Sequence, residues 1–308
     1  MNRPRVSKMI LDKIDSLKSK YADYRLNKIN KLEMSLNKAP GAVSASSNSP
    51  EKKMPDKLKI TLKTLPKQLS IAKNIEKTIK SLDENPENPK MHMDSEFKDE
   101  FEKYASSLGI NKIGYVDVPS DIIFQDRSIL FKKTIVLTME MDENAVNMAP
   151  SPQTQEDGIL TYDELGKKTN LLAQYLRKNG FSSHPSHPAG GLVVYTKLAK
   201  KAGLGNIGRH GLLITPELGP RQRISAIFIS AENLPDTSSD AHLWISEFCV
   251  SCGKCIKKCP NQAIVEKNTP QGLKTKIITD LCHGCTICMK ECSFNRLGYQ
   301  KIENNFHS

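Results

Sequence analysis

The sequence predicts an α+β protein, in which an α/β sandwich domain precedes a small cysteine-rich module. Helix and strand patterns alternate from Leu58 to Asp240, which favours helices packed on a central sheet. All eight cysteines of the 308 residues lie between Cys249 and Cys292. The first 57 residues carry much of the net charge of +11 and lack this alternation. We therefore expect four segments: residues 1–57, 58–240, 241–298 and a tail at 299–308.

A basic helical arm and linker are expected at residues 1–57. Arg3 to Lys57 hold 13 basic and 6 acidic residues, a net charge of +7. Apolar residues recur at helical spacing in this arm, at Ile10, Ile14, Leu17, Tyr21 and Tyr24. Residues 39–57 are rich in Ala, Ser and Pro and read as a linker. The stripe suits a protein or membrane-surface partner, with a solvated arm as the alternative.

The compartment and one class of partner also follow from composition. No run of about 18 apolar residues occurs, and residues 1–30 lack the apolar core of a secretion signal. We therefore expect a cytoplasmic protein. Acidic residues dilute the lysines, and no RNA-reading motif or aromatic platform is visible, so nucleic acid is not an expected partner.

The first helix and strands of the domain are expected between residues 95 and 141. SEFKDEFEKYASSLG predicts a helix with Ser95 as its N-cap and Gly109 as its stop. NKIGYVDVP (111–119) and FKKTIVLTMEM (131–141) read as strands, and the run TIVL suits a buried position.

A long helix, a loop, a short helix and a last strand follow. YDELGKKTNLLAQYLRKNG (162–180) has apolar residues on one face and ends at Gly180. SSHPSHPAGG (182–191) reads as a flexible loop, VVYTKLAKKAG (193–203) as a helix and RISAIFIS (223–230) as a strand.

Five glycines punctuate residues 198–224, at positions 203, 205, 208, 211 and 219. Gly203 to Gly208 match G-x-G-x-x-G, but a dinucleotide site requires this motif between a strand and a helix. Here the motif follows a helix and leads into an extended segment, so we reject a dinucleotide site. The glycines either form an elaborate helix-terminating turn or let the backbone approach a flat ligand.

The cysteines form two motifs of the form C-x2-C-x2-C-x3-C. Disulfides suit small secreted domains, and zinc sites use separated pairs, so both are poorer interpretations than iron–sulfur clusters. In the bacterial two-cluster pattern, the fourth cysteine of each motif ligates the other cluster. We expect two [4Fe–4S] clusters, the first bound by Cys249, Cys252, Cys255 and Cys292 and the second by Cys282, Cys285, Cys288 and Cys259.

Between the motifs, residues 263–281 predict two short strands around an Asn-Thr-Pro-Gln-Gly turn. A hairpin at this place is typical of a ferredoxin-like module, which we expect from about Trp244 to Gly298. Such a module transfers electrons, and a ferredoxin or flavodoxin is the expected donor.

AGLGNIGRHGLLITPELGPRQRI, followed by the first cysteine motif and Pro260, resembles the epoxyqueuosine reductase and reductive dehalogenase superfamily. The resemblance covers roughly Tyr162 to Cys292. It implies a nitroreductase-like α/β domain that holds cobalamin without a cobalt ligand from the protein, beside a two-cluster ferredoxin module. It also implies an oxidoreductase whose clusters reduce cobalt one electron at a time. Flavin is an alternative cofactor, because nitroreductase-like folds hold flavin too.

The resemblance places cofactor contacts on the glycine-rich segment, at Gly203, Gly205, Gly208, Arg209, His210, Gly211 and Arg221. Arg209 and His210, at the tip of the turn, would point at a ligand's edge or at carboxylate side chains. Arg221 would hold corrin amides, phosphate or backbone carbonyls.

A proton donor is harder to place. Epoxyqueuosine reductases have an acidic residue before the helix that leads to AGLG, and Ala189 occupies that place here. His184 and His187 are candidates because imidazole titrates near neutrality. Tyr195 is a third candidate, since it matches the tyrosine acids of dehalogenases in residue type.

Two functions from different classes remain. The first is an enzyme that uses two clusters and a cobamide, or a flavin, for a reductive reaction on an unknown substrate. The second is an electron-transfer or reductive-activation subunit that feeds a partner protein and has no organic cofactor of its own.

Overall fold

The structure is a computed structural model that describes residues 64–124, 127–270 and 272–308. Its centre is a four-stranded sheet in the order β1-β2-β6-β3, in which every neighbouring pair is antiparallel. The strands are β1 (Lys112–Asp117), β2 (Lys133–Glu140), β6 (Gln222–Ile229) and β3 (Ser183–Ser186). The strands predicted at 111–119, 131–141 and 223–230 are confirmed.

Alternating side chains give the sheet two apolar faces. On β2, Ile135 and Leu137 belong to one buried cluster, and Val136 belongs to the other. On β6, Ile227 and Phe228 divide in the same way. Helices must therefore cover both faces, as the sandwich interpretation requires.

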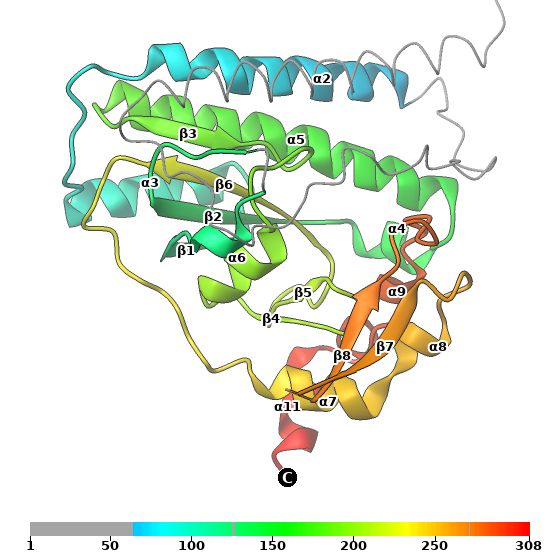
Figure 1. The fold of residues 1–308 in the computed structure, drawn as a ribbon. Coiled ribbons are helices and arrows are strands. Elements are labelled where there is room, and N and C mark those ends of the chain that lie inside the picture. The colour runs from blue at the N-terminus through cyan, green and yellow to red at the C-terminus, as the bar shows by residue number, and fades with distance from the viewer. Residues whose placement is uncertain (1–63, 125–126, 271) are drawn as a thin grey trace, which may run out of the picture.

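Three helices lie on the first side of the sheet, α3 (Ser95–Ser107), α5 (Pro152–Lys178) and α2 (Leu65–Lys80). α5 packs on the sheet and α2 packs on α5, so that α2 forms an outer layer (Figure 1). The predicted N-cap of α3 is wrong by one residue, because the Asp94 side chain accepts from the backbone N–H of Phe97. α5 begins ten residues before its predicted start, because Ser151 caps it and Pro152 suits its first turn.

The opposite face of the sheet is covered by α6 (Tyr195–Lys201), whose Leu198 and Ala199 are fully buried (Figure 1). Three short helices lie in the connections of the domain: η1 (Ser81–Glu84), η2 (Ser120–Ile122) and α4 (Glu143–Asn147).

The segment predicted as a flexible loop at 182–191 is instead largely buried and contains a strand. β3 pairs with β6 from Ser183 opposite Ile229 to Ser186 opposite Ala226. Pro185 has no N–H to donate, yet it is tolerated because β3 is the edge strand of the sheet.

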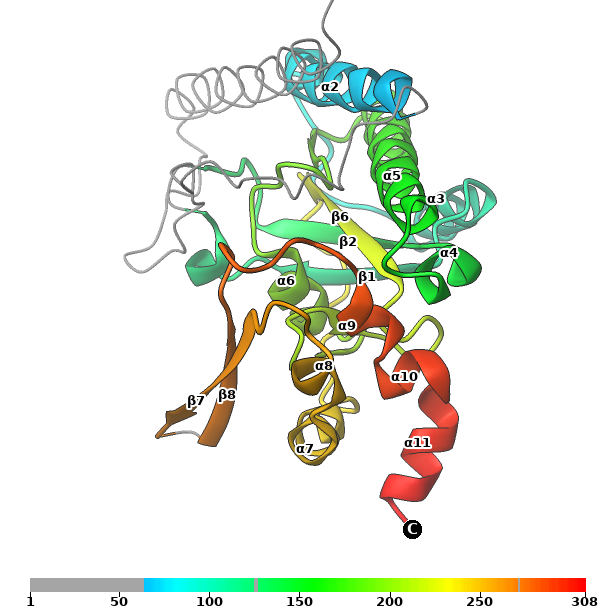
Figure 2. The same cartoon turned by 90° about the vertical axis from the view of Figure 1, so that its right-hand side faces the viewer.

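The cysteine-rich module consists of short helices and a hairpin. The helices are α7 (Trp244–Cys252), α8 (Lys254–Lys257), α9 (Ile287–Lys290), α10 (Ser293–Arg296) and α11 (Tyr299–Phe306). The predicted hairpin is confirmed as β7 (Ile264–Thr269) and β8 (Gly272–Ile277). In Figure 2, helices α7 and α8 lie between the hairpin on one side and helices α10 and α11 on the other.

The predicted tail at 299–308 is mostly helix α11, which belongs to the module. Tyr299 and Ile302 are buried in the apolar cluster that contains Trp244 and Phe294. The Trp244 Nε1–H donates to the Tyr299 hydroxyl at 3.2 Å, so α11 closes one side of the module.

A two-stranded ribbon, β4 (Asn206–Ile207) and β5 (Leu213–Ile214), joins the domain to the module. The Asn206 Nδ2 amide donates to the carbonyl of His242 and to Ser246 Oγ, both at 3.0 Å, which fixes the start of α7. The ribbon is the middle of the glycine-rich segment, so that segment lies at the junction.

The basic arm and the linker expected at residues 1–57 lie outside the described residues, so the structure does not bear on them. Over the described part of the chain, every helix is too short or too polar to cross a membrane.

Candidate iron–sulfur site and glycine-rich junction

The four cysteines expected to hold the first cluster surround one cavity. Cys249, Cys252, Cys255 and Cys292 all line this cavity, which is small. Cys292 interacts electrostatically with Cys249 and Cys255, although about 40 positions separate it from them in the sequence. The crossed set therefore meets in space, which is what four-thiolate ligation of one cluster requires.

The second set also converges. Cys288 interacts electrostatically with Cys285, Cys282 and Cys259, and also with Cys255 of the first set. Cys259 comes from the first motif, so the second set also brings together cysteines from both motifs. The two sets are neighbours, as electron transfer between two clusters requires. Ligation of iron by these eight thiols stays a prediction.

Burial strongly disfavours free thiolates at the most buried of these cysteines. Loss of water raises the pKa of Cys249 to about 11 and that of Cys292 to about 12. Burial and, secondly, the neighbouring cysteines raise the pKa of Cys288 to about 12. A coordinated cation offsets this cost, since metals bind the deprotonated thiol. The donor set therefore fits iron–sulfur clusters.

The glycines expected to contact a cofactor instead meet the protein's own atoms. A Cβ on Gly203 would lie 2.2 Å from the Thr237 carbonyl oxygen, and one on Gly205 would lie 2.0 Å from that of Ile214. A Cβ on Gly211 would lie 3.3 Å from Ile277 of the hairpin. Close backbone packing thus explains Gly203 and Gly205 without a ligand.

Arg209 joins the junction to the module rather than to an open site. Its guanidinium forms an ion pair with Glu266 of β7 and donates to the Val250 carbonyl at 3.3 Å. Of the two partners expected for Arg209, the carboxylate side chain is the one that the structure shows. His210, the next residue, is buried and lines the cavity of the first cysteine set.

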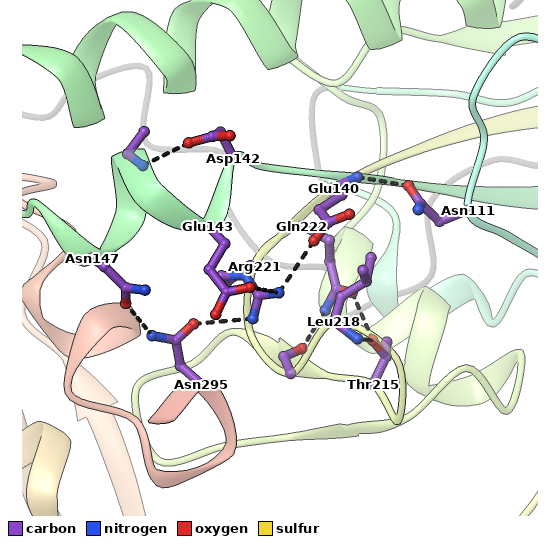
Figure 3. Close-up of polar contacts among 12 residues, drawn as sticks. Asn111, Glu140, Asp142, Glu143, Asn147, Thr215, Leu218, Arg221, Gln222 and Asn295 are labelled. Atoms are coloured by element: carbon purple, nitrogen blue, oxygen red, sulfur yellow. Dashed lines mark hydrogen bonds and ion pairs between the residues drawn. The ribbon is translucent and has the colours of Figure 1, made fainter. Parts of the chain in front are cut away.

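Arg221 does not meet the expected partners. Its guanidinium lies between Glu140 and Glu143, with N–O distances of 3.2 and 3.3 Å, and donates to the Asn295 side-chain oxygen at 3.2 Å (Figure 3). Asn295 in turn donates to Asn147 at 2.9 Å. Arg221 therefore connects the edge of the sheet to α10, and its carboxylate partners replace the corrin amides or phosphate that we expected.

The two candidate histidines are fully buried: His184 lies on β3 beside Phe228 of β6, and His187 follows β3 and packs against α5. His184 Nδ1 accepts from the backbone N–H of Leu130 at 3.2 Å. His187 Nδ1 accepts from the N–H of Ala189 at 3.0 Å, and a Cβ on Gly166 of α5 would lie 2.0 Å from His187 Nε2. Burial lowers the pKa of His187 to about 4. His187 is therefore neutral near pH 7, and it does not lie in a flexible loop as the sequence predicted.

Tyr195 ties α6 to β3. Its hydroxyl is 2.9 Å from the Ser186 carbonyl, 2.8 Å from the His187 carbonyl and 2.7 Å from Ser186 Oγ. These contacts give the hydroxyl a structural role. A role for Tyr195, His184 or His187 as proton donor stays a prediction.

Sequence reasoning missed the residues that join the domain to the module. Asn206, Glu266 and Asn295 have no motif of their own, and their partners lie between 36 and 148 positions away. The polar residue Asn206 inside the glycine-rich segment was the one local signal.

The comparisons with known proteins agree with both parts of the chain. Residues 248–297 match the family model of the 4Fe-4S dicluster domain. A tetrachloroethene reductive dehalogenase of Dehalobacter restrictus is 36% identical over 143 residues, which are 46% of this chain and 25% of that protein. The epoxyqueuosine reductase of Bacillus subtilis is 23% identical over 258 residues, covering 65% of this chain and 64% of that protein.

A solved structure supports the fold. A variant of the catabolic reductive dehalogenase NpRdhA superposes with a TM-score of 0.65 at 18% identity, covering 78% of this chain and 37% of that one. The chain spans a quarter to a third of the length of the dehalogenases it matches in sequence. It is a homologue of reductive dehalogenases and epoxyqueuosine reductases that carries a 4Fe-4S dicluster domain.

Proposed function

We propose that this protein is an iron–sulfur oxidoreductase whose two clusters deliver electrons to a cobamide, or to a flavin, for a reductive reaction. The observation that carries the proposal is the meeting of the two crossed cysteine sets directly beside the glycine-rich junction. A bound cobamide would supply a strongly reducing metal centre. An external one-electron donor, such as a ferredoxin or flavodoxin, would reload the clusters in the cytoplasm.

The residues of the chain would each contribute a defined part. The eight thiols would hold the iron, and the surrounding helices would exclude water from the buried set. Arg209 and Arg221 fix the module against the domain, so that the distance from clusters to acceptor stays constant. Constant distance matters because positioning sets the rate of each transfer.

A second function is favoured by a specific observation. The side-chain volumes of Gly203 and Gly205 are filled by the chain itself, and Arg209 and Arg221 have protein partners. A subunit that only relays electrons to a partner protein needs no cofactor contacts at these positions. The two functions therefore differ in whether the isolated chain binds an organic cofactor.

Titration of hydroxocobalamin, and separately of flavin mononucleotide, into anaerobically reconstituted protein distinguishes them. Saturable binding of either, with both clusters present by iron and sulfide analysis, supports the enzyme. Two intact clusters without saturable binding assign the electron-transfer subunit. Protein that cannot hold iron after reconstitution contradicts both.

The crossed ligand sets have their own test in a reciprocal pair of variants. Cys259→Ser should damage the second cluster and Cys252→Ser the first, as read by iron content and electron paramagnetic resonance. Loss of the first cluster alone in Cys259→Ser would contradict the crossing.

A further inference from the structure

His210 has a fixed tautomer. Its Nδ1 accepts a hydrogen bond from the backbone N–H of Leu212 at 3.1 Å, so that nitrogen carries no proton. Nε2 therefore carries the proton of the ring and is a hydrogen-bond donor. The side chain is buried, with 5% of its surface exposed.

The donor has no acceptor in the described part of the chain. Nε2 of His210 is buried without a hydrogen-bond partner, which is costly unless a ligand supplies one. His210 lines the same cavity as Cys249, Cys252, Cys255 and Cys292. The acceptor that fits this place is sulfur, from a cysteine thiolate or from the cluster itself.

The turn around His210 is shaped for this contact. A Cβ on Gly208 would lie 2.8 Å from Cε1 and 3.2 Å from Nε2 of His210, so the glycine leaves room for the ring. The backbone of Arg209 hydrogen-bonds the Cys249 thiol. Phe248 and Phe294 also line the cavity, and in such apolar surroundings a hydrogen bond is electrostatically stronger than in water.

We propose that the Nε2–H of His210 donates a hydrogen bond to a sulfur of the first cluster and thereby raises the reduction potential of that cluster above the value it would have without this bond. Reduction adds one electron, whose charge spreads over the sulfur atoms, while no proton moves. A donor aimed at sulfur stabilises the reduced state more than the oxidised state. His210 is thus a positioning residue that tunes the reduction potential of the first cluster. The inference rests on the proposed function for the presence of the clusters.

The test compares His210→Leu, which removes the donor, with His210→Gln, which keeps an amide N–H. Redox titrations followed by electron paramagnetic resonance give both potentials, with signals assigned through Cys252→Ser and Cys259→Ser. In His210→Leu the equilibrium constant for reduction of the first cluster should fall about tenfold, which is about 59 mV for one electron. His210→Gln should recover part of the loss, and the second cluster serves as the internal control.

An unchanged first potential in His210→Leu, or an equal shift of both clusters, overturns the proposal. If His210→Leu fails to hold the first cluster, a measurement on the wild-type protein tests the proposal instead. Hyperfine coupling of an exchangeable proton and a ¹⁵N-labelled histidine nitrogen to the reduced first cluster is expected, and its absence overturns the proposal. Wild-type protein without clusters would instead contradict the proposed function.

Discussion

At the scale of single residues, two of the candidate proton donors form hydrogen bonds with the backbone. His187 accepts from the N–H of Ala189, and the Tyr195 hydroxyl lies within hydrogen-bond distance of the Ser186 and His187 carbonyls. These hydrogen bonds give each polar group a neutral partner, so no charge is added to the core. Burial keeps His187 in its neutral form near pH 7, so pH should act on this residue through stability.

His187 gives a pH prediction. The unfolded chain protonates this ring near pH 6.5, whereas burial lowers its folded pKa to about 4. Between these values the unfolded state binds more protons, so the free energy of unfolding falls as pH falls and is constant above the window. From pH 7.5 to 5.5 the loss should be about 1.4 kcal/mol. Because the buried His210 adds a similar loss, urea titrations should show a loss that is about 1.4 kcal/mol smaller in His187→Gln than in wild type and in the exposed control His92→Gln. An equal loss in all three proteins would contradict the prediction.

Gly205 gives a packing prediction. Gly205→Ala places a Cβ 2.0 Å from the Ile214 carbonyl oxygen, so β4 and β5 must separate. The free energy of unfolding should fall by about 2–3 kcal/mol. Gly190→Ala is the matched control, since it has a φ of +86° and open space around its Cβ, and should lose only about 1 kcal/mol. Equal losses in thermal or urea unfolding would mean that close packing at Gly205 is unimportant.

At the scale of elements, the sequence predicted what local patterns specify. The β-prone run in β2 and the turn between β7 and β8 are local signals, and both elements form. β3 could not be predicted, because Ser183–Ser186 has no β-branched residue and contains Pro185. It is a strand because β6 supplies its partners. For α11 the signal existed, since Tyr299, Ile302 and Phe306 recur at helical spacing, but their apolar partner Trp244 lies 55 positions away.

The packing of α11 gives a prediction at this scale. Ile302 is buried with 3% of its surface exposed, so Ile302→Ala removes apolar contacts with the module and leaves a cavity. We expect a loss of about 2–4 kcal/mol in the free energy of unfolding. The chain has one tryptophan, Trp244, so its fluorescence reports unfolding of this region. Gln300→Ala, on the exposed side of α11, should change little, and a similar loss there would show that helix propensity rather than burial dominates.

At the scale of the whole molecule, two arginines from the glycine-rich segment hold the domain and module together. Arg209 reaches β7, and Arg221 reaches α10 (Figure 3). The sequence indicated that both are functional but not what they contact, because Glu140 is 81 positions from Arg221 and Asn295 is 74 positions away. The cysteine sets were predictable because cluster ligation imposes a fixed spacing on the cysteines along the sequence. Ion pairs across an interface impose no such spacing on their partners.

Arg221 and Arg223 form a matched pair that tests this coupling. Arg221 immediately precedes β6, and Arg223 lies at the start of that strand. Arg223, however, stacks over Tyr162 within the domain, with its guanidinium 4.5 Å from the ring centroid. In Arg221→Met the hydrogen bond to Asn295 is lost, and Glu140 and Glu143 lose their shared cation. A charged hydrogen bond contributes roughly 1.5–3 kcal/mol. The equilibrium constant for local opening of α10 should therefore rise at least about tenfold, since about 1.4 kcal/mol corresponds to a factor of ten.

Hydrogen exchange at Ser293–Arg296 measures this opening, and Arg223→Met should leave that exchange unchanged. Faster exchange in both variants would place the effect in the sheet, and slow exchange in both would mean that Arg221 does not hold the module.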